Sequence, residues 1–219
     1  MMLKSCGVLI LAAGQSARMG SPKFALQYAD GLSFIENIVH QYSRAGCSKI
    51  VGVFNSAEHG QLVGLMPDLA DKMLIVENPN AEMGRFSSLQ CGLAALDQSR
   101  LVFVHNVDNP LAKLSVLEKL LGNIDDFDFA KPVYSGKGGH PILVKKNIVE
   151  AVLCKKNEHT NLRLFLKQFK GKQVEVDDYS ILWNINKPED LKQFEKYRSG
   201  ACERIEMKFV KPYRNGINF

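Results

Sequence analysis

Short apolar runs of strand length recur along the chain, and longer stretches with helical patterning separate them. Parallel strands cannot be joined by a tight turn, so a chain that alternates strand and helix builds a mostly parallel sheet with helices on both faces. We therefore expect one three-layer α/β/α, Rossmann-like domain over residues 1–200, although two small lobes would also fit the length. The strands are expected at residues 8–11, 50–54, 73–76, 101–104, 127–133 and 141–144.

The first helix has the clearest boundaries. Ser33 and Glu36 match a capping box, in which each side chain accepts a hydrogen bond from the other residue's backbone N–H, and Gly46 is placed to end the helix. Its buried face is expected to carry Phe34, Ile35, Ile38, Val39 and Tyr42. Further helices are expected at residues 86–96, 114–121, 161–169 and 188–197, the last of which opens with a proline.

Composition narrows the class of protein. The chain has 219 residues and a net charge of +5, with its basic residues scattered, which suits a phosphate-rich small substrate and does not demand a nucleic-acid partner. Five widely spaced cysteines without a Cys-x-x-Cys pair indicate neither a disulfide framework nor a thiolate zinc site. We therefore expect a cytoplasmic protein.

Both ends of the chain allow more than one interpretation. The apolar run at residues 7–13 imitates a short secretory signal, but it is far too short to span a bilayer and leads into a glycine-rich basic turn. A buried strand explains it better, and no membrane contact is expected. The basic tail at residues 201–219 could pack as a late strand, join a neighbouring subunit or stay partly mobile. The oligomeric state is left open.

The loop at residues 12–23 lies where an α/β sheet binds its ligands, beyond the carboxyl end of the first strand. Its many small residues let the backbone approach a ligand closely, and successive N–H groups can form a concavity for an anion. Arg18 and Lys23 add positive charge. The plain alternative is a tight turn with two surface cations. The spacing matches neither Gly-x-x-x-x-Gly-Lys-Ser/Thr nor Gly-x-Gly-x-x-Gly, so two common phosphate-binding loops are excluded.

Residues 11–23 read Leu-Ala-Ala-Gly-x-Ser-x-Arg-Met-Gly-x-Pro-Lys, which closely resembles the opening motif of the MobA-like and MocA-like nucleotidyltransferases of molybdenum cofactor synthesis. The resemblance implies a nucleotidyltransferase domain whose loop wraps a nucleoside triphosphate. It gives Arg18 and Lys23 a catalytic role, in which they neutralise the β- and γ-phosphates that leave as pyrophosphate. The loop residues that it assigns to the nucleotide are Leu11, Ala12, Ala13 and Gly14.

Two later segments resemble the same family in the same order. Residues 84–92 resemble its Gly-x-x-x-Ser-Leu-x-x-Gly segment, which implies that Gly84 and Ser88 contact the base; the alternative is that Ser87 or Ser88 only caps a helix. Asp108 stands in Asp-x-Pro-Leu after an apolar strand, and is expected to serve both nucleotide binding and catalysis by holding Mg²⁺ between the α-phosphate and the acceptor. A surface turn is the bland alternative.

The last two matches lie at the acceptor side and at the metal. His140, in Gly-Gly-His-Pro, would orient the acceptor phosphate or only fix the turn through a backbone hydrogen bond. Where the family commonly shows Asp-Ile-Asp, this chain reads Asn184-Ile185-Asn186. An amide oxygen can still bind Mg²⁺, so Asn186 is the favoured second metal ligand and Asn184 the alternative.

Together these residues predict a Mg²⁺-dependent enzyme that transfers a nucleoside monophosphate from a triphosphate to a phosphorylated small molecule. An oxygen of the acceptor phosphate would attack the α-phosphorus, and no general base is required because that oxygen is already anionic. Ala13 favours CTP, since the cytidylyl-transferring branch of the family resembles this chain in Leu-Ala-Ala-Gly whereas the guanylyl-transferring branch usually carries Leu-Ala-Gly-Gly. Molybdopterin is the best family-level acceptor.

Three alternatives stay open. The acceptor would otherwise be 2-C-methyl-D-erythritol 4-phosphate or a sugar phosphate, although the methylerythritol enzymes typically show His-Asp-Ala-Ala-Arg-Pro where this chain differs at residues 105–110. The two amides, Asn184 and Asn186, would also suit a nucleotide-binding paralogue without turnover. A nucleoside-diphosphate-sugar glycosyltransferase would want Asp-x-Asp after a central strand, which residues 106–108 only half supply.

Overall fold

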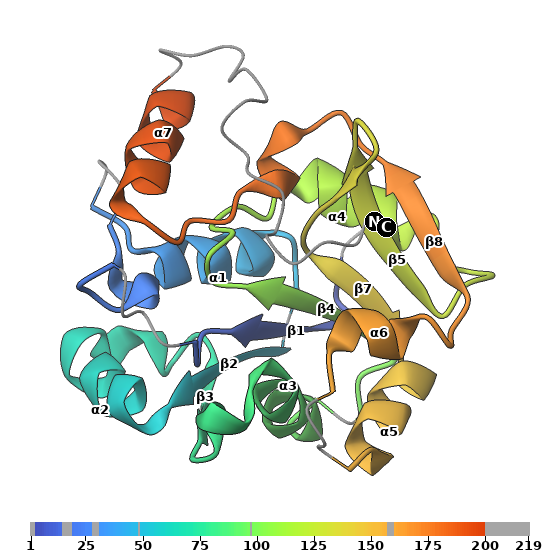
Figure 1. Cartoon of the computed structure of the whole chain (residues 1–219), viewed down its shortest axis with the longest axis horizontal. Coiled ribbons are helices and arrows are strands. Elements are labelled where there is room, and N and C mark those ends of the chain that lie inside the picture. Colours follow the sequence, from blue (N-terminus) through green and yellow to red (C-terminus); the bar gives the residue numbers. More distant parts are fainter. Residues whose placement is uncertain are drawn as a thin grey trace.

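The computed structural model describes residues 3–14, 19–27, 31–47, 49–96, 98–156 and 160–199. These residues form one eight-stranded sheet with helices on both faces (Figure 1). The strands are β1 (Cys6–Leu11), β2 (Lys49–Asn55), β3 (Leu74–Asn78), β4 (Leu101–Asn106), β5 (Phe129–Tyr134), β6 (Lys137–Gly138), β7 (Ile142–Lys145) and β8 (Gly171–Glu175). The helices are α1 (Phe34–Arg44), α2 (Ser56–Leu65), α3 (Arg85–Ala94), α4 (Leu114–Leu121), α5 (Lys146–Cys154), α6 (Leu162–Leu166) and α7 (Pro188–Arg198).

The sheet is mostly parallel, as the alternation of strands and helices predicts. Its order is β3-β2-β1-β4-β7-β5-β6, with β8 also paired to β5. Strands β3, β2, β1 and β4 run parallel to one another, and β8 runs parallel to β5. Only β7 and the short β6 pair antiparallel with their neighbours among the strands described. The fold class expected from the sequence is confirmed.

All six expected strands form, with ends that differ from the expectation by at most two residues. Strand β8 was not predicted, because its sequence Gly-Lys-Gln-Val-Glu is polar and only Val174 is buried. Helices α2 and α5 were also not predicted. Helix α2 contains two glycines and lacks a clear apolar stripe, and α5 begins directly after β7 without a turn that would announce it.

Helix α1 forms as its sequence indicates. The Glu36 N–H donates to Ser33 Oγ over 3.3 Å, and the Ser33 N–H donates to Glu36 Oε2 over 2.9 Å, so the capping box is complete. All five residues expected on its inner face are buried. Gly46 follows the helix with a φ of 89°, in the left-handed region that favours glycine.

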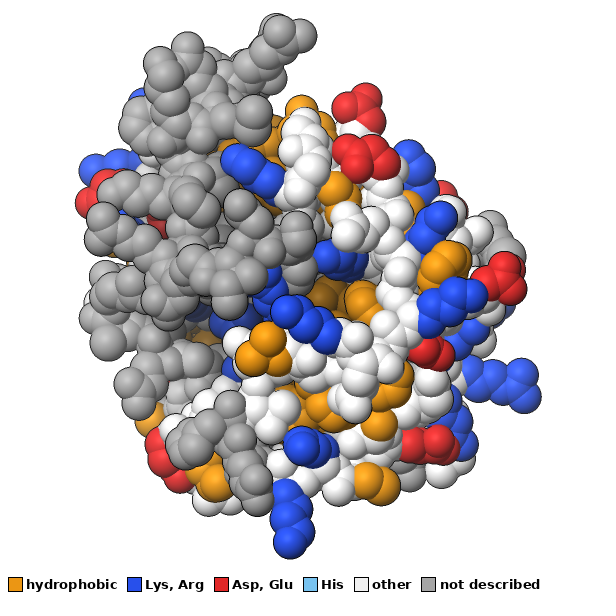
Figure 2. Space-filling view, turned by 45° about the vertical axis from the view of Figure 1, so that its right-hand side comes forward, with side chains coloured by type: hydrophobic (Ala, Val, Ile, Leu, Met, Phe, Trp, Pro, Cys, Tyr) orange, Lys and Arg blue, Asp and Glu red, His pale blue; other side chains and the backbone are white. Residues whose placement is uncertain are grey.

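The helices cover the sheet in two layers (Figure 1). Helices α1, α4 and α7 contribute to the core on one face, and α3, α5 and α6 to the core on the other. On the side of the molecule seen in Figure 2, Lys and Arg side chains are interspersed with acidic and apolar ones, which agrees with the scattered basic residues of the sequence. Among the described residues, no helix is both long enough and apolar enough to cross a bilayer.

The central strands bring two predicted segments together. Strands β1 and β4 pair with Leu11 beside Asn106, and the Val107 N–H donates to the Leu11 carbonyl over 3.1 Å. The loops that follow these strands therefore leave the sheet side by side, at the edge where ligands bind in open α/β folds. The tail expected at residues 201–219 lies outside the described residues.

Candidate active site

The loop after β1 is described at its two ends. Ala12 and Ala13 are buried against the sheet, and Gly14 is exposed. Arg18 falls in the range 15–18, outside the described residues, and its catalytic role stays a prediction. At the far end of the loop Lys23 opens a single 3₁₀ turn, η1 (Lys23–Ala25).

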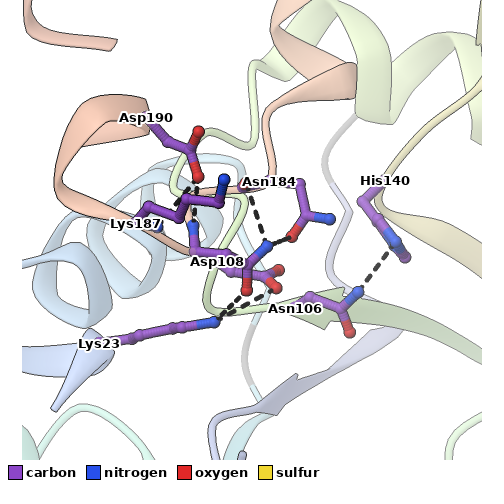
Figure 3. A network of polar contacts seen from close by, with 8 residues as sticks. Lys23, Asn106, Asp108, His140, Asn184, Lys187 and Asp190 are labelled. Atoms are coloured by element: carbon purple, nitrogen blue, oxygen red, sulfur yellow. Dashed lines mark hydrogen bonds and ion pairs between the residues drawn. The ribbon is translucent and has the colours of Figure 1, made fainter. Parts of the chain in front are cut away.

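Lys23 meets two predicted metal ligands at the carboxyl end of the sheet (Figure 3). Its ammonium nitrogen donates a hydrogen bond to Asn186 Oδ1 and lies 3.9 Å from Asp108 Oδ2. The three residues come from η1, from the loop after β4 and from the segment that precedes α7. The Lys23 and Asp108 side chains are 16% and 11% exposed, so water screens their attraction only in part. The structure therefore assembles three of the residues that the sequence singled out.

Asp108 is a buried carboxyl surrounded by positive charge. Burial raises its pKa above the ordinary value, because a charge is costly away from water, while the nearby charges of Lys23 and Arg85 act against that shift. The Ile185 N–H donates to the Asp108 carbonyl over 2.8 Å and ties the loop after β4 to the segment that carries Asn186. The backbone at Asp108 is thus held in place, and the charged form of its carboxyl is favoured by the neighbouring cations.

Asn186 is oriented by contacts on its other side. Its Nδ2 donates to Asn184 Oδ1 over 2.6 Å, which leaves its own Oδ1 toward Lys23. The backbone N–H groups of Asn186 and Lys187 both donate to Asp190 Oδ2, at 2.9 and 3.0 Å, at the start of α7. Of the two candidate amides, Asn186 faces Lys23, and Asn184 holds the Asn186 side chain in position.

The donor set can be compared with what a metal ion needs. The described residues contain no group of three or more His, Cys, Asp or Glu side chains that could hold a metal. They offer the Asp108 carboxylate and the Asn186 amide oxygen, which are hard oxygen donors on either side of an ammonium ion. Mg²⁺ is usually held by one or two carboxylates together with substrate phosphates and water. The residues therefore fit Mg²⁺ bound with a triphosphate, and do not form an all-protein cage.

His140 lies beside the end of β4, away from Lys23 (Figure 3). Asn106 Nδ2 donates to His140 Nε2 over 2.9 Å, which places the ring proton on Nδ1, and Nδ1 is buried without a partner among the described residues. Burial lowers the pKa of His140 to about 4, and the charge of Arg85 adds to that shift, so the ring is neutral near pH 7. Its backbone N–H donates to the Ile181 carbonyl over 3.0 Å, which is the turn-fixing bond that the sequence suggested.

The Ile181 carbonyl links three segments of the site. It accepts from the His140 N–H and from Asn109 Nδ2, the latter over 2.9 Å. Gly139 makes this approach possible, because a Cβ there would lie 2.3 Å from the same oxygen. The second glycine of the Gly-Gly-His-Pro motif is therefore explained by the close approach of another backbone segment.

A buried histidine supports the loop that carries Asp108. His105 is fully buried; its Nε2 donates to the Asn109 carbonyl over 2.6 Å, and the Tyr42 hydroxyl donates to its Nδ1 over 2.9 Å. Burial lowers its pKa to about 4, so the imidazole is neutral and its two nitrogens have fixed roles. His105 is a packing residue, as expected for a histidine without ligand spacing.

Ser88 belongs to a separate polar group at the ends of β3 and α3. Asn78 Nδ2 donates to Ser87 Oγ over 2.8 Å and to Ser88 Oγ over 3.0 Å, and both serines are buried. Helix α3 is capped by Gly84, with a φ of 98° and no side-chain cap, so the capping alternative for the serines is wrong. Contact of Ser88 with a base stays a prediction.

A cleft of about 640 Å³ opens beside this group, between the loop after β1 and the carboxyl ends of β2 and β3. Its lining includes Ala13, Pro22, Asn55, Asn78 and Glu82. Sequence reasoning missed Asn55 and Asn78. The available signal was an asparagine close behind each of two apolar strand runs, Asn55 directly after residues 50–54 and Asn78 two positions after residues 73–76.

Arg85 was also missed. It is exposed at the first turn of α3, and its charge acts on both Asp108 and His140. A cation directly after the glycine of the Gly-x-x-x-Ser segment was the signal that could have revealed it. Arg85 therefore adds positive charge that reaches both Asp108 and His140.

Residues 8–174 match the family model described as the MobA-like NTP transferase domain. The molybdenum cofactor cytidylyltransferase of Escherichia coli (strain K12) is 26% identical over 183 residues, which cover 84% of this chain and 92% of that protein. The molybdenum cofactor guanylyltransferase of Desulfosudis oleivorans is 24% identical over 199 residues, which cover 85% and 93%. The nicotine blue oxidoreductase of Paenarthrobacter nicotinovorans is 26% identical over 168 residues, which cover 73% and 80%.

A solved structure of a nucleotidyl transferase from Methanothermobacter has the same fold. It superposes with a TM-score of 0.74 over 90% of this chain and 98% of that chain, at 16% sequence identity. The likeness at this identity concerns the architecture, and it agrees with the mostly parallel sheet described above.

Proposed function

The chain belongs to the MobA-like NTP transferase family, and we propose that it is a Mg²⁺-dependent enzyme that transfers CMP from CTP to the phosphate of molybdopterin, with release of pyrophosphate. The observation that carries this proposal is the convergence of Lys23, Asp108 and Asn186 at the carboxyl ends of β1 and β4. A buried carboxylate, an amide oxygen and an ammonium ion at this edge suit a triphosphate that binds together with a metal ion.

In the proposed reaction an oxygen of the acceptor phosphate attacks the α-phosphorus of the triphosphate. A new bond forms between that oxygen and the α-phosphorus, the bond from the α-phosphorus to the bridging oxygen breaks, and pyrophosphate leaves with its negative charge. Lys23 and Arg18 stabilise that charge, and the backbone N–H groups of the loop after β1 hold the phosphates. Because the attacking oxygen is anionic, none of the residues has to remove a proton.

Asp108 and Asn186 are the residues that would hold Mg²⁺, which supplies positive charge at the α-phosphate and the acceptor oxygen when it is bound. His140 lies beside the end of β4, away from Lys23, and the charge of Arg85 acts on it, so we place the acceptor on this side. The neutral His140 ring can donate a hydrogen bond from Nδ1, and Arg85 can pair with the acceptor phosphate.

The cleft beside Ala13 is the proposed site of the base. Ser88 is bonded to Asn78, which lines the cleft, and Gly84 follows the lining residues Ala81 and Glu82 in the chain. A methyl group at Ala13, on one wall, crowds a purine more than a pyrimidine, which supports CTP. The relatives include both a cytidylyltransferase and a guanylyltransferase, so the base has to be measured. We expect CTP to raise the thermal unfolding temperature more than GTP does; a larger shift with GTP would contradict the assignment.

Incubation with each of the four nucleoside triphosphates, Mg²⁺ and a set of acceptors, followed by measurement of pyrophosphate, tests the activity. Molybdopterin with CTP should give the fastest release, and methylerythritol phosphate and sugar phosphates are the comparison acceptors. Pyrophosphate release that does not depend on an acceptor would contradict the proposal. So would the lack of release with every combination of triphosphate and acceptor. The second outcome, with intact CTP binding, would favour a paralogue without turnover.

The oxidoreductase among the relatives makes a further control necessary, since similar identity there accompanies another reaction. A nicotinamide or flavin cofactor should neither raise the unfolding temperature nor be reduced or oxidised by the protein.

We propose a cytoplasmic location, because Cys6, Cys47, Cys91 and Cys154 are all free thiols.

A further inference from the structure

Lys23 contacts both of the residues that are proposed to hold Mg²⁺. Its ammonium nitrogen donates to Asn186 Oδ1 and lies 3.9 Å from Asp108 Oδ2, and Figure 3 shows the Lys23 side chain pointing toward Asp108. We propose that in the nucleotide-free enzyme Lys23 takes the place of the metal ion, so that a divalent cation binds tightly only when a triphosphate draws Lys23 away. The proposal rests on the function proposed above.

The contacts of Asp108 and Asn186 show why the two cations compete. Both oxygens that a metal ion would use are directed at the Lys23 nitrogen. A divalent ion bound to them would lie a few ångströms from the ammonium, in a place that water screens poorly, and the two positive charges would repel one another strongly. One cation therefore has to leave before the other can bind.

Contacts that do not involve Lys23 hold the segments that carry the two ligands. The Asp108 backbone carbonyl accepts from the Ile185 N–H over 2.8 Å, which ties these two segments together. The Asn186 amide donates to Asn184 over 2.6 Å, and its backbone N–H donates to Asp190 over 2.9 Å. We therefore expect the Asn186 oxygen and the loop that carries Asp108 to remain in place when the lysine moves or is replaced.

Lys23 also has a nearby alternative partner once a triphosphate is present. It lies at the end of the loop that is proposed to wrap the phosphates, and its long flexible side chain can turn from Asp108 to a phosphate oxygen. The same step removes the competing charge and supplies the phosphate oxygens that a Mg²⁺ ion needs. A buried charge without a partner is costly. In the absence of nucleotide, Lys23 therefore stabilises the buried carboxylate of Asp108 by pairing with it.

Titration of the full-length protein with Mn²⁺ alone, followed by electron paramagnetic resonance of the free ion, tests the exchange. Without nucleotide, Lys23→Met should bind Mn²⁺ about tenfold or more tightly than the wild type, because the competing charge is gone. Lys23→Gln, which removes the charge but places a neutral hydrogen-bond donor near Asn186, is the second variant in case Lys23→Met does not fold. The matched control is Lys187→Met, which removes an exposed lysine charge next to Asn186 and should bind Mn²⁺ as the wild type does.

Two further samples complete the test. Asp108→Asn in the Lys23→Met background should lose the gain, which locates the ion at this carboxylate. In the wild type, Mn²⁺ should bind tightly once CTP is added. Unchanged Mn²⁺ affinity in both Lys23 variants would overturn the exchange, even if pyrophosphate release supports the proposed function. A gain in Mn²⁺ affinity without any pyrophosphate release would retain the exchange and contradict the function.

Discussion

At one end of the proposed nucleotide site, side chains from two distant segments face one cation from a third; at the other end, neutral side chains bond to one another. Lys23 meets Asp108 and Asn186 at the first end, and Asn78 joins the Ser87 and Ser88 hydroxyls at the second. Charged and polar groups gathered at one point can stabilise the charge of a reacting phosphate. Neutral groups that bond to one another can instead form a rigid wall of the binding site. Substitutions should therefore be costly for turnover at the first end and modest for binding at the second.

The largest difference is expected for Asp108→Asn. Loss of the carboxylate removes the main metal ligand, and by analogy with removal of one preorganised charged or polar group we expect a rate lower by about 100- to 1000-fold. Stability should not fall, because the buried carboxyl is disfavoured as an anion. Pyrophosphate release and thermal unfolding check both points. The control Asp126→Asn, at an exposed aspartate, should leave the rate unchanged. If Asp108→Asn retains more than a tenth of the wild-type rate, the proposed difference between the two ends of the nucleotide site is contradicted.

Gly139→Ala probes the backbone under the charged end. The new Cβ would lie 2.3 Å from the Ile181 carbonyl oxygen, so the segment leading to Asn186 has to shift, and we expect a loss of about 3 kcal/mol or more of stability. Gly138→Ala is the matched control, since its Cβ would meet only the Lys131 side chain at an ordinary 3.7 Å. Urea unfolding measures both variants. Equal stability of the two would mean that the approach of Ile181 is not fixed by Gly139.

The buried His105 should make stability fall in acid. Its folded pKa is about 4 against an ordinary value of 6.5, so between these values the unfolded chain binds a proton that the folded chain excludes. Stability is therefore full above pH 6.5 and decreases toward pH 4, by about 2 kcal/mol at pH 5. His140 acts in the same direction, while the raised pKa of Asp108 acts against it.

Urea midpoints at pH 7 and pH 5 measure this effect. His105→Asn should show a smaller decrease than the wild type, and His40→Asn, at an exposed histidine, should show the full decrease. Equal urea midpoints for the wild type at both pH values would show that the pKa of His105 is not lowered in the folded protein.

The smallest effect is expected at the base end. Ser88→Ala removes one hydroxyl, but Asn78 keeps its bond to Ser87, so stability and CTP binding should each change by about 1 kcal/mol or less. Isothermal titration with CTP measures the binding. A loss of more than about tenfold in affinity at unchanged stability would show that Ser88 contributes directly to recognition and that this end is more than a wall.

The sequence predicted the elements whose pattern is local. The capping box and the inner face of α1 depend on residues close together in the chain, and apolar runs mark the central strands. Strand β8 could not be predicted, because five mostly polar residues become a strand only through pairing with β5. Helix α2 has two glycines that weaken its local preference, so its tertiary contacts decide its structure.

For the site, the motifs identified Lys23, Asp108 and Asn186, but not their mutual contacts. Their separation of up to 163 positions means that only the sheet order brings them together. Arg85 was missed because it stands at a variable position of the Gly-x-x-x-Ser segment, and Asn78 was missed because it lies outside the motifs. Choosing Asn186 over Asn184 as the ligand required the direction of one amide group, which no sequence pattern contains.

The most direct test of the proposed reaction follows the α-phosphate itself. CTP labelled at the α-phosphorus is incubated with the protein, Mg²⁺ and molybdopterin, and the products are separated. We expect the label in the acceptor, with one pyrophosphate released for each label transferred, and almost none with Asp108→Asn. Label that stays in CTP, or that appears as free CMP whether or not the acceptor is present, would contradict nucleotidyl transfer by Lys23, Asp108 and Asn186.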